Sequence, residues 1–345
     1  MSGLDQALQG LLAKWQGRSG APAILTHVRS GDGRIDVRGA AGAAPDTRFP
    51  IASVTKMFTA ALIQQLCDEG RIALDDRIAA HLPDVDLAGL HRVKGVDQTP
   101  RLTVRHLLFQ TSGLADYFEG GIADDLLAGR DRDYDLADVL AMARARRPMA
   151  PVGTTRAHYS DTNFQLLGAI IESVTGQSYD AAVKARICAP LGLTKTALYD
   201  PVRDTDTLPV CADGRPIAVG KALASMKADG GIVSDTDELL TFLMAFLRGE
   251  LFDPAALPIL QDWRPLSFPR SYGGGLMRFR LPGWLTLWRP TPTLVGHSGA
   301  SGTFAYHAQE QDLYVAGTFN QMGETRRPFQ FMQEAVQAIA AEAAR

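Results

Sequence analysis

The chain of 345 residues has few cysteines and lacks the common metal-binding patterns. Its three cysteines, Cys67, Cys188 and Cys211, lie far apart and form no CxxC pair, which argues against a disulfide framework and against a zinc site. The seven histidines include no HExxH pattern and no pair at helical spacing with a carboxylate. We therefore expect no bound metal.

Long apolar runs and a strong excess of one charge are also missing. The longest apolar run, Leu239–Leu247, is too short to span a bilayer, and the N-terminus lacks the basic region and continuous apolar segment of a signal peptide. The net charge is −3, and the densest basic cluster, in "ARARRPMA", is typical of a solvated helix end. We expect a cytoplasmic protein that binds neither nucleic acid nor membrane. The sequence carries no signal for an oligomeric state.

Helix and strand signals are distributed unevenly along the chain. Apolar residues at helical spacing predict a helix over Leu4–Trp15, and two β-prone runs around Gly31-Asp32-Gly33 predict a hairpin. The middle, about residues 75–225, is rich in helix signals. The tail predicts an antiparallel meander and then a helix over Pro328–Ala344; its strand-like runs are "YGGGLMRFRL", "GWLTLWR", "TLVGHSGASGTFAYHA" and "DLYVAGTFN".

This order of elements predicts an α+β fold. We expect an antiparallel sheet built from both chain ends and flanked by helices, with an inserted, mostly helical domain. The expected parts are residues 1–75 together with 226–345, and residues 76–225. The active site is expected at their junction.

A serine and a lysine stand one helical turn apart in "FPIASVTKMFTAALIQQLCDEGRIALDD", which runs from Phe49 to Asp76. If a helix begins at Ser53, Ser53 and Lys56 lie on one face of it. The helix N-terminus favours negative charge on an attacking serine oxygen. Burial among apolar neighbours would lower the pKa of Lys56 and let it act as a base. A chance Ser-x-x-Lys in an ordinary helix is the alternative, because the pattern alone is common.

Two further short motifs could serve the same chemistry. Tyr159 precedes a predicted helix over Thr162–Gly176, and it is either an ordinary core aromatic or a proton relay beside Ser53. The stretch Gly296-His-Ser-Gly lies between two strand-like runs, where glycines allow close approach of a ligand or another backbone. Alone, this stretch could equally be a bulge in the meander.

Together, in this order, the three motifs resemble the serine β-lactamase-like superfamily, which includes class C β-lactamases, DD-peptidases, D-aminopeptidases and related esterases. The resemblance covers about residues 49–320 and includes "LTVRHLLFQTSGLADY", "YSDTNFQLLGAIIESVTGQSY", "LGLTKTALYD", "ADGGIVSDTDELLTFL" and "GHSGASGTF". It implies hydrolysis of a small ester or amide by acyl transfer through a covalent acyl-enzyme, with no metal or organic cofactor.

The resemblance also implies a role for each matching residue. Ser53 would be the nucleophile, and Lys56 would be its base or the cation that keeps Tyr159 partly ionised. Tyr159 would pass a proton to the leaving group. The backbone N–H groups of Ser53 and Ala300 would form the oxyanion hole. The residues implied in substrate binding are Asp161, His297, Ser298 and Gly299.

The sequence departs from the family pattern at two of these positions. Asp161 stands where β-lactamases and DD-peptidases usually have Asn; an ionised Asp only accepts hydrogen bonds, which suits a substrate amine or hydroxyl, or a contact with Lys56. His297 stands in place of Lys, pulls less on a substrate carboxylate, and could change its charge near neutral pH. Both departures favour an esterase or a peptidase of unusual specificity over efficient β-lactam hydrolysis.

Several alternatives stay open from the residues alone. Ser160 could relay the proton instead of Tyr159. Ser298 nearly matches the nucleophile elbow of an α/β-hydrolase, although no βαβ alternation precedes it. A true β-lactamase or DD-peptidase, a slow-turnover acylated sensor and a non-catalytic scaffold are the other candidate functions. Gln110 is interpreted as a structural hydrogen-bonding residue, and the candidate pocket aromatics are Trp263, Tyr272, Trp284 and Trp288.

Overall fold

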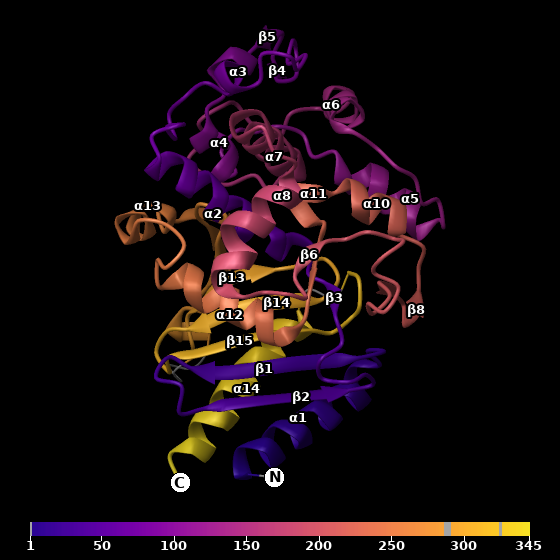
Figure 1. Ribbon diagram of the computed structural model, residues 1–345, viewed down its shortest axis with the longest axis vertical. Helices are drawn as coiled ribbons and strands as arrows, with labels where there is room; N and C mark the ends of the chain where they lie inside the picture. Colours follow the sequence, from indigo (N-terminus) through magenta and orange to yellow (C-terminus); the bar gives the residue numbers. More distant parts are fainter. Residues whose placement is uncertain (1, 286–290, 324–325) are drawn as a thin grey trace.

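The computed structural model describes residues 2–285, 291–323 and 326–345 (Figure 1). At the centre of this part of the chain is an antiparallel sheet with the strand order β10-β11-β12-β13-β14-β15-β1-β2. Because β1 pairs with β15, strands from both ends of the chain form one sheet, as predicted. The strands are β1 (Ile24–Ser30), β2 (Asp36–Ala41), β10 (Arg264–Ser267), β11 (Arg270–Tyr272), β12 (Met277–Phe279), β13 (Leu294–Ser298), β14 (Thr303–Ala308) and β15 (Leu313–Thr318).

Helices cover both faces of this sheet. On one face lies α12 (Thr236–Leu247), whose Asp237 Oδ1 is 3.1 Å from the Nη2 atom of Arg29 on β1. On the other face lie α1 (Gly3–Ser19) and α14 (Arg327–Ala343), and the ring of Phe331 on α14 lies 5.9 Å from that of Phe304 on β14. The sheet is therefore a middle layer. Successive side chains of a strand point to opposite faces of the sheet, so each strand contributes to the packing on both sides.

The predicted helical part lies at the opposite end of the molecule from the two termini (Figure 1). Its helices are α3 (Ile78–His81), α4 (Val104–Leu108), α5 (Ala123–Leu127), α6 (Leu136–Arg144), α7 (Asp161–Thr175), α8 (Tyr179–Val183), α9 (Ala189–Leu191) and α10 (Gly220–Ser225). The helix α11 (Lys227–Gly230) follows directly after the predicted end of this part at residue 225. Short 3-10 turns (η2, Thr99–Arg101) and π-helical turns (η3, Phe118–Ile122; η4, Lys184–Cys188) connect them. The long apolar helix α2 (Thr55–Asp68) packs against α7 and α11 and joins this part to the sheet.

Smaller strands hold the segments around α2 in place. Strand β9 (Ile232–Ser234) pairs with β3 (Phe49–Pro50) and with β6 (Ala197–Leu198). This pairing fixes the end of α11 beside the start of α2. The remaining short elements are β4 (Arg92–Val93) with β5 (Val96–Asp97), β7 (Cys211–Ala212) with β8 (Arg215–Pro216), η5 (Pro254–Ala256), α13 (Leu257–Leu260) and η6 (Gly283–Leu285).

Most of the predicted elements are present. The predicted α+β fold is confirmed, and α7 ends at Gly176, whose φ of +69° is the left-handed conformation that favours glycine. One strand prediction is wrong: in "GWLTLWR", Gly283–Leu285 forms a 3-10 turn, and residues 286–290 lie outside the described residues. The domain boundaries at residues 75/76 and 225/226 stay predictions. Among the described residues, no helix is both long and apolar enough to cross a membrane.

Candidate active site

Ser53 lies in the 3-10 turn η1 (Ala52–Val54), directly before α2 begins at Thr55. The turn starts from a strained backbone, because Ala52 has a φ of +47°, which is unfavourable for a residue with a Cβ atom. Lys56 follows in the first turn of α2, and its Nζ atom lies 3.0 Å from Ser53 Oγ. The predicted one-turn spacing therefore brings the two side chains into hydrogen-bond contact.

Lys56 is completely buried, and its ammonium group is paired with a carboxylate. The Nζ atom lies 2.5 Å from Asp161 Oδ1 and donates a hydrogen bond to the Asp229 carbonyl oxygen at 2.6 Å. Burial alone would lower the pKa of Lys56, but the carboxyl groups nearby, Asp161 above all, outweigh burial, so the pKa is raised. The expected lowering of the Lys56 pKa is therefore wrong, because the sequence neighbours of Lys56 did not show which carboxylates the fold brings to it.

Tyr159 lies beside both of these groups. The Ser53 hydroxyl is near enough to act on the pKa of Tyr159, and Lys56 Nζ lies 5.1 Å from the centre of its ring. Burial and the negative charge of Asp161 raise the pKa of Tyr159 well above its usual value. The expectation of a partly ionised Tyr159 is therefore wrong, and the resting group is a neutral phenol.

Gln110 holds the backbone on both sides of Tyr159. Its carbonyl oxygen accepts from His158 N–H at 2.8 Å, and its side-chain Oε1 accepts from Ser160 N–H at 2.9 Å. The Ser160 hydroxyl donates to the Ala115 carbonyl at 3.1 Å. Because the Ser160 hydroxyl is engaged there, the geometry favours Tyr159 over Ser160 as the proton relay. Gln110 was interpreted as structural, and it acts here as a positioning residue.

Two further carboxyl groups, which the sequence did not reveal, lie beside the ion pair of Lys56 and Asp161. Asp116 Oδ1 accepts a hydrogen bond from Asp161 N–H at 2.9 Å, and burial together with the Asp161 charge raises the pKa of Asp116 to about 7. Asp229 is fully buried and accepts from the Tyr117 hydroxyl at 2.8 Å; burial, with the Asp161 charge, raises its pKa well above normal. Both lie in the family-like blocks "LADY" and "ADGG", and that position is the only signal for them in the sequence.

His297 is on β13 and reaches the same site from the sheet. Its Nδ1 atom lies 2.8 Å from the Ser298 carbonyl oxygen, and its Nε2 atom lies 3.4 Å from the Tyr272 hydroxyl. Its ring centre is 6.2 Å from that of Tyr159. Burial, and then the charge of Lys56, lowers the pKa of His297 to about 3. The expected change of charge near neutral pH is therefore wrong, because this imidazole stays neutral.

The residues after His297 form a tight turn against the nucleophile. A Cβ atom on Gly299 would lie 2.6 Å from the Ile51 carbonyl oxygen, so only glycine fits without a shift of the backbone. The Ser298 hydroxyl bonds to Tyr306 at 2.8 Å and is engaged within the sheet. A strand position in place of a strand-to-helix turn also disfavours Ser298 as an α/β-hydrolase nucleophile.

Two backbone N–H groups are available at this turn. In the described part of the chain, neither Ser53 N–H nor Ala300 N–H donates a backbone hydrogen bond, and Ala300 is exposed. Gly299, which precedes Ala300, lies against Ile51 and Ala52, which precede Ser53. This contact brings the two N–H groups to the same turn. Such free donors are what an oxyanion hole needs. Their predicted role remains a prediction.

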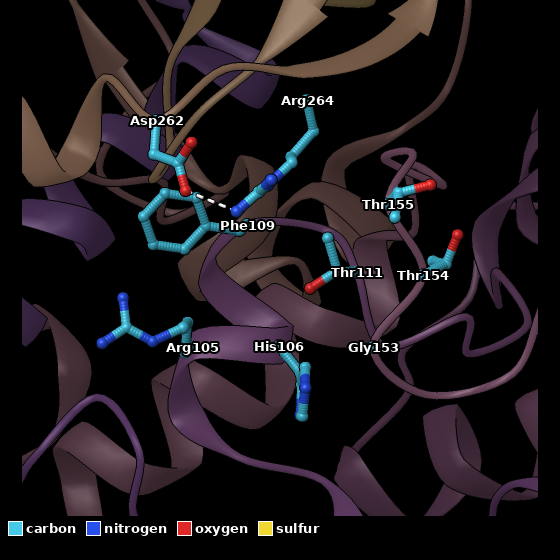
Figure 2. A pocket seen from close by; sticks show the side chains of 9 residues that line it. All are labelled: Arg105, His106, Phe109, Thr111, Gly153, Thr154, Thr155, Asp262 and Arg264. Carbon is cyan, nitrogen blue, oxygen red and sulfur yellow. Dashed lines mark hydrogen bonds and ion pairs between the residues drawn. The ribbon is translucent and has the colours of Figure 1, made fainter.

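Figure 2 shows a separate pocket of about 190 Å³ beside α4, which holds none of the predicted site residues. The arginines there are paired with carboxylates: Arg264 contacts Asp262, and Arg105 Nε lies 2.7 Å from Asp75 Oδ1. The charges of this pocket are therefore largely balanced. Its lining residues are Arg105, His106, Phe109, Thr111, Gly153, Thr154, Thr155, Asp262 and Arg264.

The beta-lactamase family matches residues 5–339, nearly the whole chain, so the chain belongs to this family. Penicillin-binding protein 4 of Amycolatopsis lactamdurans is 37% identical over 291 residues, which are 76% of this chain and 68% of that protein. A putative D-alanyl-D-alanine carboxypeptidase of Escherichia coli K12 is 33% identical, but the match covers 50% of this chain and only 38% of that protein.

Solved structures agree with the family. A D-stereospecific amidohydrolase from a Streptomyces species is 30% identical with a TM-score of 0.78, and the match covers 94% of this chain and 97% of that one. The D-amino acid amidase of Ochrobactrum anthropi SV3 has a TM-score of 0.80 over the whole of both chains but is 22% identical, so it supports the fold alone. The family and fold make the chain a serine hydrolase of amides or esters.

Proposed function

We propose that the chain cleaves small esters or amides through a covalent acyl-enzyme on Ser53. The observation that carries this proposal is the position of one buried ammonium group between a hydroxyl and a carboxylate. Lys56 Nζ lies 3.0 Å from Ser53 Oγ and 2.5 Å from Asp161 Oδ1. A nucleophile in contact with a base that is itself oriented by a third group is the usual arrangement for an activated serine.

The raised pKa values of Lys56 and Tyr159 define the resting state as ammonium and phenol. In the proposed acylation, Lys56 first passes a proton to Asp161. The resulting amine then accepts the Ser53 proton as Oγ attacks the carbonyl carbon and the carbonyl π bond opens. Charge is conserved within the buried pair, so no proton has to reach solvent.

Collapse of the tetrahedral intermediate breaks the bond to the leaving group. Tyr159 donates its phenolic proton to that group, Lys56 reprotonates Tyr159, and Asp161 returns the proton to Lys56. In net terms, Ser53 has lost one proton and the leaving amine or alcohol has gained one. Water then attacks the acyl-enzyme by the reverse route. Two backbone donors at Ser53 and Ala300 would hold the oxyanion, each contributing roughly 10²–10³ in rate.

Two features support a substrate other than a β-lactam. The neutral His297 cannot attract a carboxylate as a lysine would, and Asp161 replaces an amide donor with an acceptor. The solved D-stereospecific amidohydrolase at 30% identity supports amides of D configuration as the amide candidates, beside simple esters. A true β-lactamase or DD-peptidase and a slow-turnover sensor are the competing functions.

The test is hydrolysis of p-nitrophenyl butyrate, D-phenylalanine amide and benzylpenicillin by wild type and by Ser53→Ala. A fluorophosphonate probe, which labels activated serines, is applied to both proteins in parallel. We expect turnover of an ester or of the amide, one label per wild-type chain, and neither result with Ser53→Ala.

Each other outcome selects an alternative. Labelling without turnover would indicate a sensor, and absence of both would indicate a scaffold. Activity that survives Ser53→Ala but is lost in Ser298→Ala would overturn the proposal in favour of the elbow nucleophile.

A further inference from the structure

A groove of about 740 Å³ lies at the β10–β11–β12 edge of the sheet. Four arginines line it, and we call it the arginine groove: Arg156, Arg270, Arg278 and Arg280. Hydroxyl groups and apolar side chains complete the lining, and its two aromatic residues are exposed, Phe268 by 70% and Trp284 by 63%. The lining contains no acidic residue.

These four guanidinium groups have no carboxylate partner in the described part of the chain. None of them forms an ion pair with another described residue, in contrast to Arg105 and Arg264 in the pocket of Figure 2. Three of the four lie in a stretch poor in possible partners, because residues 263–309 contain five arginines and no Asp or Glu. The charge of Arg280 reaches Glu310, but both carboxylate oxygens of Glu310 are taken by Thr293, at 2.7 Å each.

The bonds that the groove arginines do make leave their charge unneutralised. Arg270 donates to the Ser267 hydroxyl at 2.8 Å, and Arg156 donates to the Leu266 carbonyl at 3.1 Å. Arg278 lies over the Trp263 ring at 4.9 Å. Burial, and then the charge of Arg280, lowers the pKa of Arg278, which shows that like charges meet here. Arg270 and Arg278 are partly buried and Arg156 and Arg280 are exposed. Arginines without a carboxylate partner are suited to bind carboxylates in a bidentate manner.

The arginine groove lies on strands next to the one that carries His297. In the β12–β13 register Arg278 pairs with Val295, and Val295 shares a face of β13 with His297. Arg156 lies three residues before Tyr159. Arg270 is close enough for its charge to lower the pKa of His297, after the larger effects of burial and of Lys56. By this register, Arg278 lies on the same face of the sheet as His297.

We propose that the arginine groove binds a carboxylate-bearing part of the substrate, remote from the scissile carbonyl, so that the preferred substrates are acidic esters or amides. This inference rests on the proposed function. The exposed rings of Phe268 and Trp284 would cover the apolar chain that joins the carboxylate to the reacting group. The neutral site around His297 would then hold the reacting carbonyl. The cationic groove would select substrates that carry a negative charge.

The test compares 4-nitrophenyl monoesters of dicarboxylic acids with neutral acyl esters of equal length, over a series of chain lengths. The readout is the acidic-to-neutral ratio of kcat/KM in wild type, in Arg278→Gln/Arg280→Gln and in Arg280→Gln. Arg34→Gln is the matched control, because Arg34 lies on the β1–β2 hairpin with its side chain 87% exposed. If the double variant fails to fold, the comparison uses Arg280→Gln alone, because Arg280 is exposed.

We expect wild type to prefer the acidic ester at one or more lengths. The ratio should fall about tenfold or more in the double variant, which removes two charged hydrogen-bond donors, and should fall at high salt. Arg34→Gln should keep the wild-type ratio. A ratio that is equal in all variants, with hydrolysis still dependent on Ser53, would overturn the groove proposal and leave the proposed function intact.

Citrate, a tricarboxylate, tests the groove without turnover. Calorimetric titration should show binding to wild type and to Ser53→Ala, and weaker binding to the double arginine variant. If neither ester is hydrolysed but citrate binds in this way, the proposed function fails and the anion site stands. If citrate does not bind, or binds equally to the arginine variants, the anion site is overturned.

Discussion

The surroundings of Lys56 and the aromatic cluster between the sheet and helices α1 and α14 are both buried. The first consists of charged and polar groups, and the second consists of aromatic rings. Around Lys56 the fold buries an ammonium group, carboxyl groups and phenols within hydrogen-bond distance of each other. Between the sheet and helices α1 and α14 it buries aromatic rings in edge-to-face contact, with the ring of Phe331 5.4 Å from that of Phe319 and 6.2 Å from that of Trp15.

The difference separates chemistry from stability. Aromatic burial releases free energy without a compensating cost in desolvated charge. Buried charges are costly and stay favourable only when each has a partner. We therefore expect substitutions in the aromatic cluster to change the free energy of unfolding and substitutions near Lys56 to change activity first.

The largest effect is expected for Lys56→Met. Loss of the proton route should lower kcat/KM by at least about a thousandfold, in the range found when a member of a catalytic group is removed. The carboxylate of Asp161 also loses its partner, which should cost about 3 kcal/mol in the free energy of unfolding. Ester kinetics and urea denaturation measure the two effects.

The matched control is Lys56→Met/Asp161→Asn, which removes the unpaired charge. It should recover most of the lost stability and none of the activity. Recovery of activity in the double variant would contradict a role for Lys56 in proton transfer.

Phe331→Ala tests the other region. Removal of this ring should cost about 3–5 kcal/mol in the free energy of unfolding, because it leaves a cavity between α14 and the sheet. The kcat of the folded fraction, normalised by fluorophosphonate labelling, should equal that of wild type at low temperature. A lower kcat per labelled site would show that the two regions are coupled and would break the comparison.

Asp116→Asn should change how stability depends on pH. The folded-state pKa of Asp116 is raised from 3.8 to about 7, so its contribution to stability is full below pH 3.8 and is lost as the pH rises towards 7. Wild type should therefore lose about 2 kcal/mol between about pH 5 and pH 8 that the variant keeps. Thermal unfolding of both proteins across this range measures it; a constant difference would show that Asp116 titrates normally.

The sequence was most informative where the relevant distance is local. The contact between Ser53 and Lys56 follows from helical spacing, and the glycine stop of α7 follows from backbone conformation. The sheet from both chain ends follows from the order of strand and helix signals. Each of these depends on residues that are close in sequence or on a repeated pattern.

The charge states could not be predicted in this way. The pKa of Lys56 depends on Asp161 and Asp229, which lie more than a hundred positions away along the chain, and the Asp229 contact is a backbone carbonyl that carries no side-chain signal. The neutrality of His297 depends on burial between Tyr272 and the helical part. The arginine groove had a signal, the absence of acids over residues 263–309, but only the fold shows which of those arginines meet.

Asp161→Asn should give the smallest effect and the sharpest distinction. If Asp161 accepts the Lys56 proton, the variant must release that proton to solvent, and its kcat/KM should rise with pH. The pKa of Lys56 should fall in the variant, because the largest favourable charge is gone. The deficit against wild type should thus be about tenfold at neutral pH and should close as the pH rises. A deficit that stays constant with pH would mean that Asp161 only orients a permanently charged Lys56, and the proton from Ser53 would then need another acceptor.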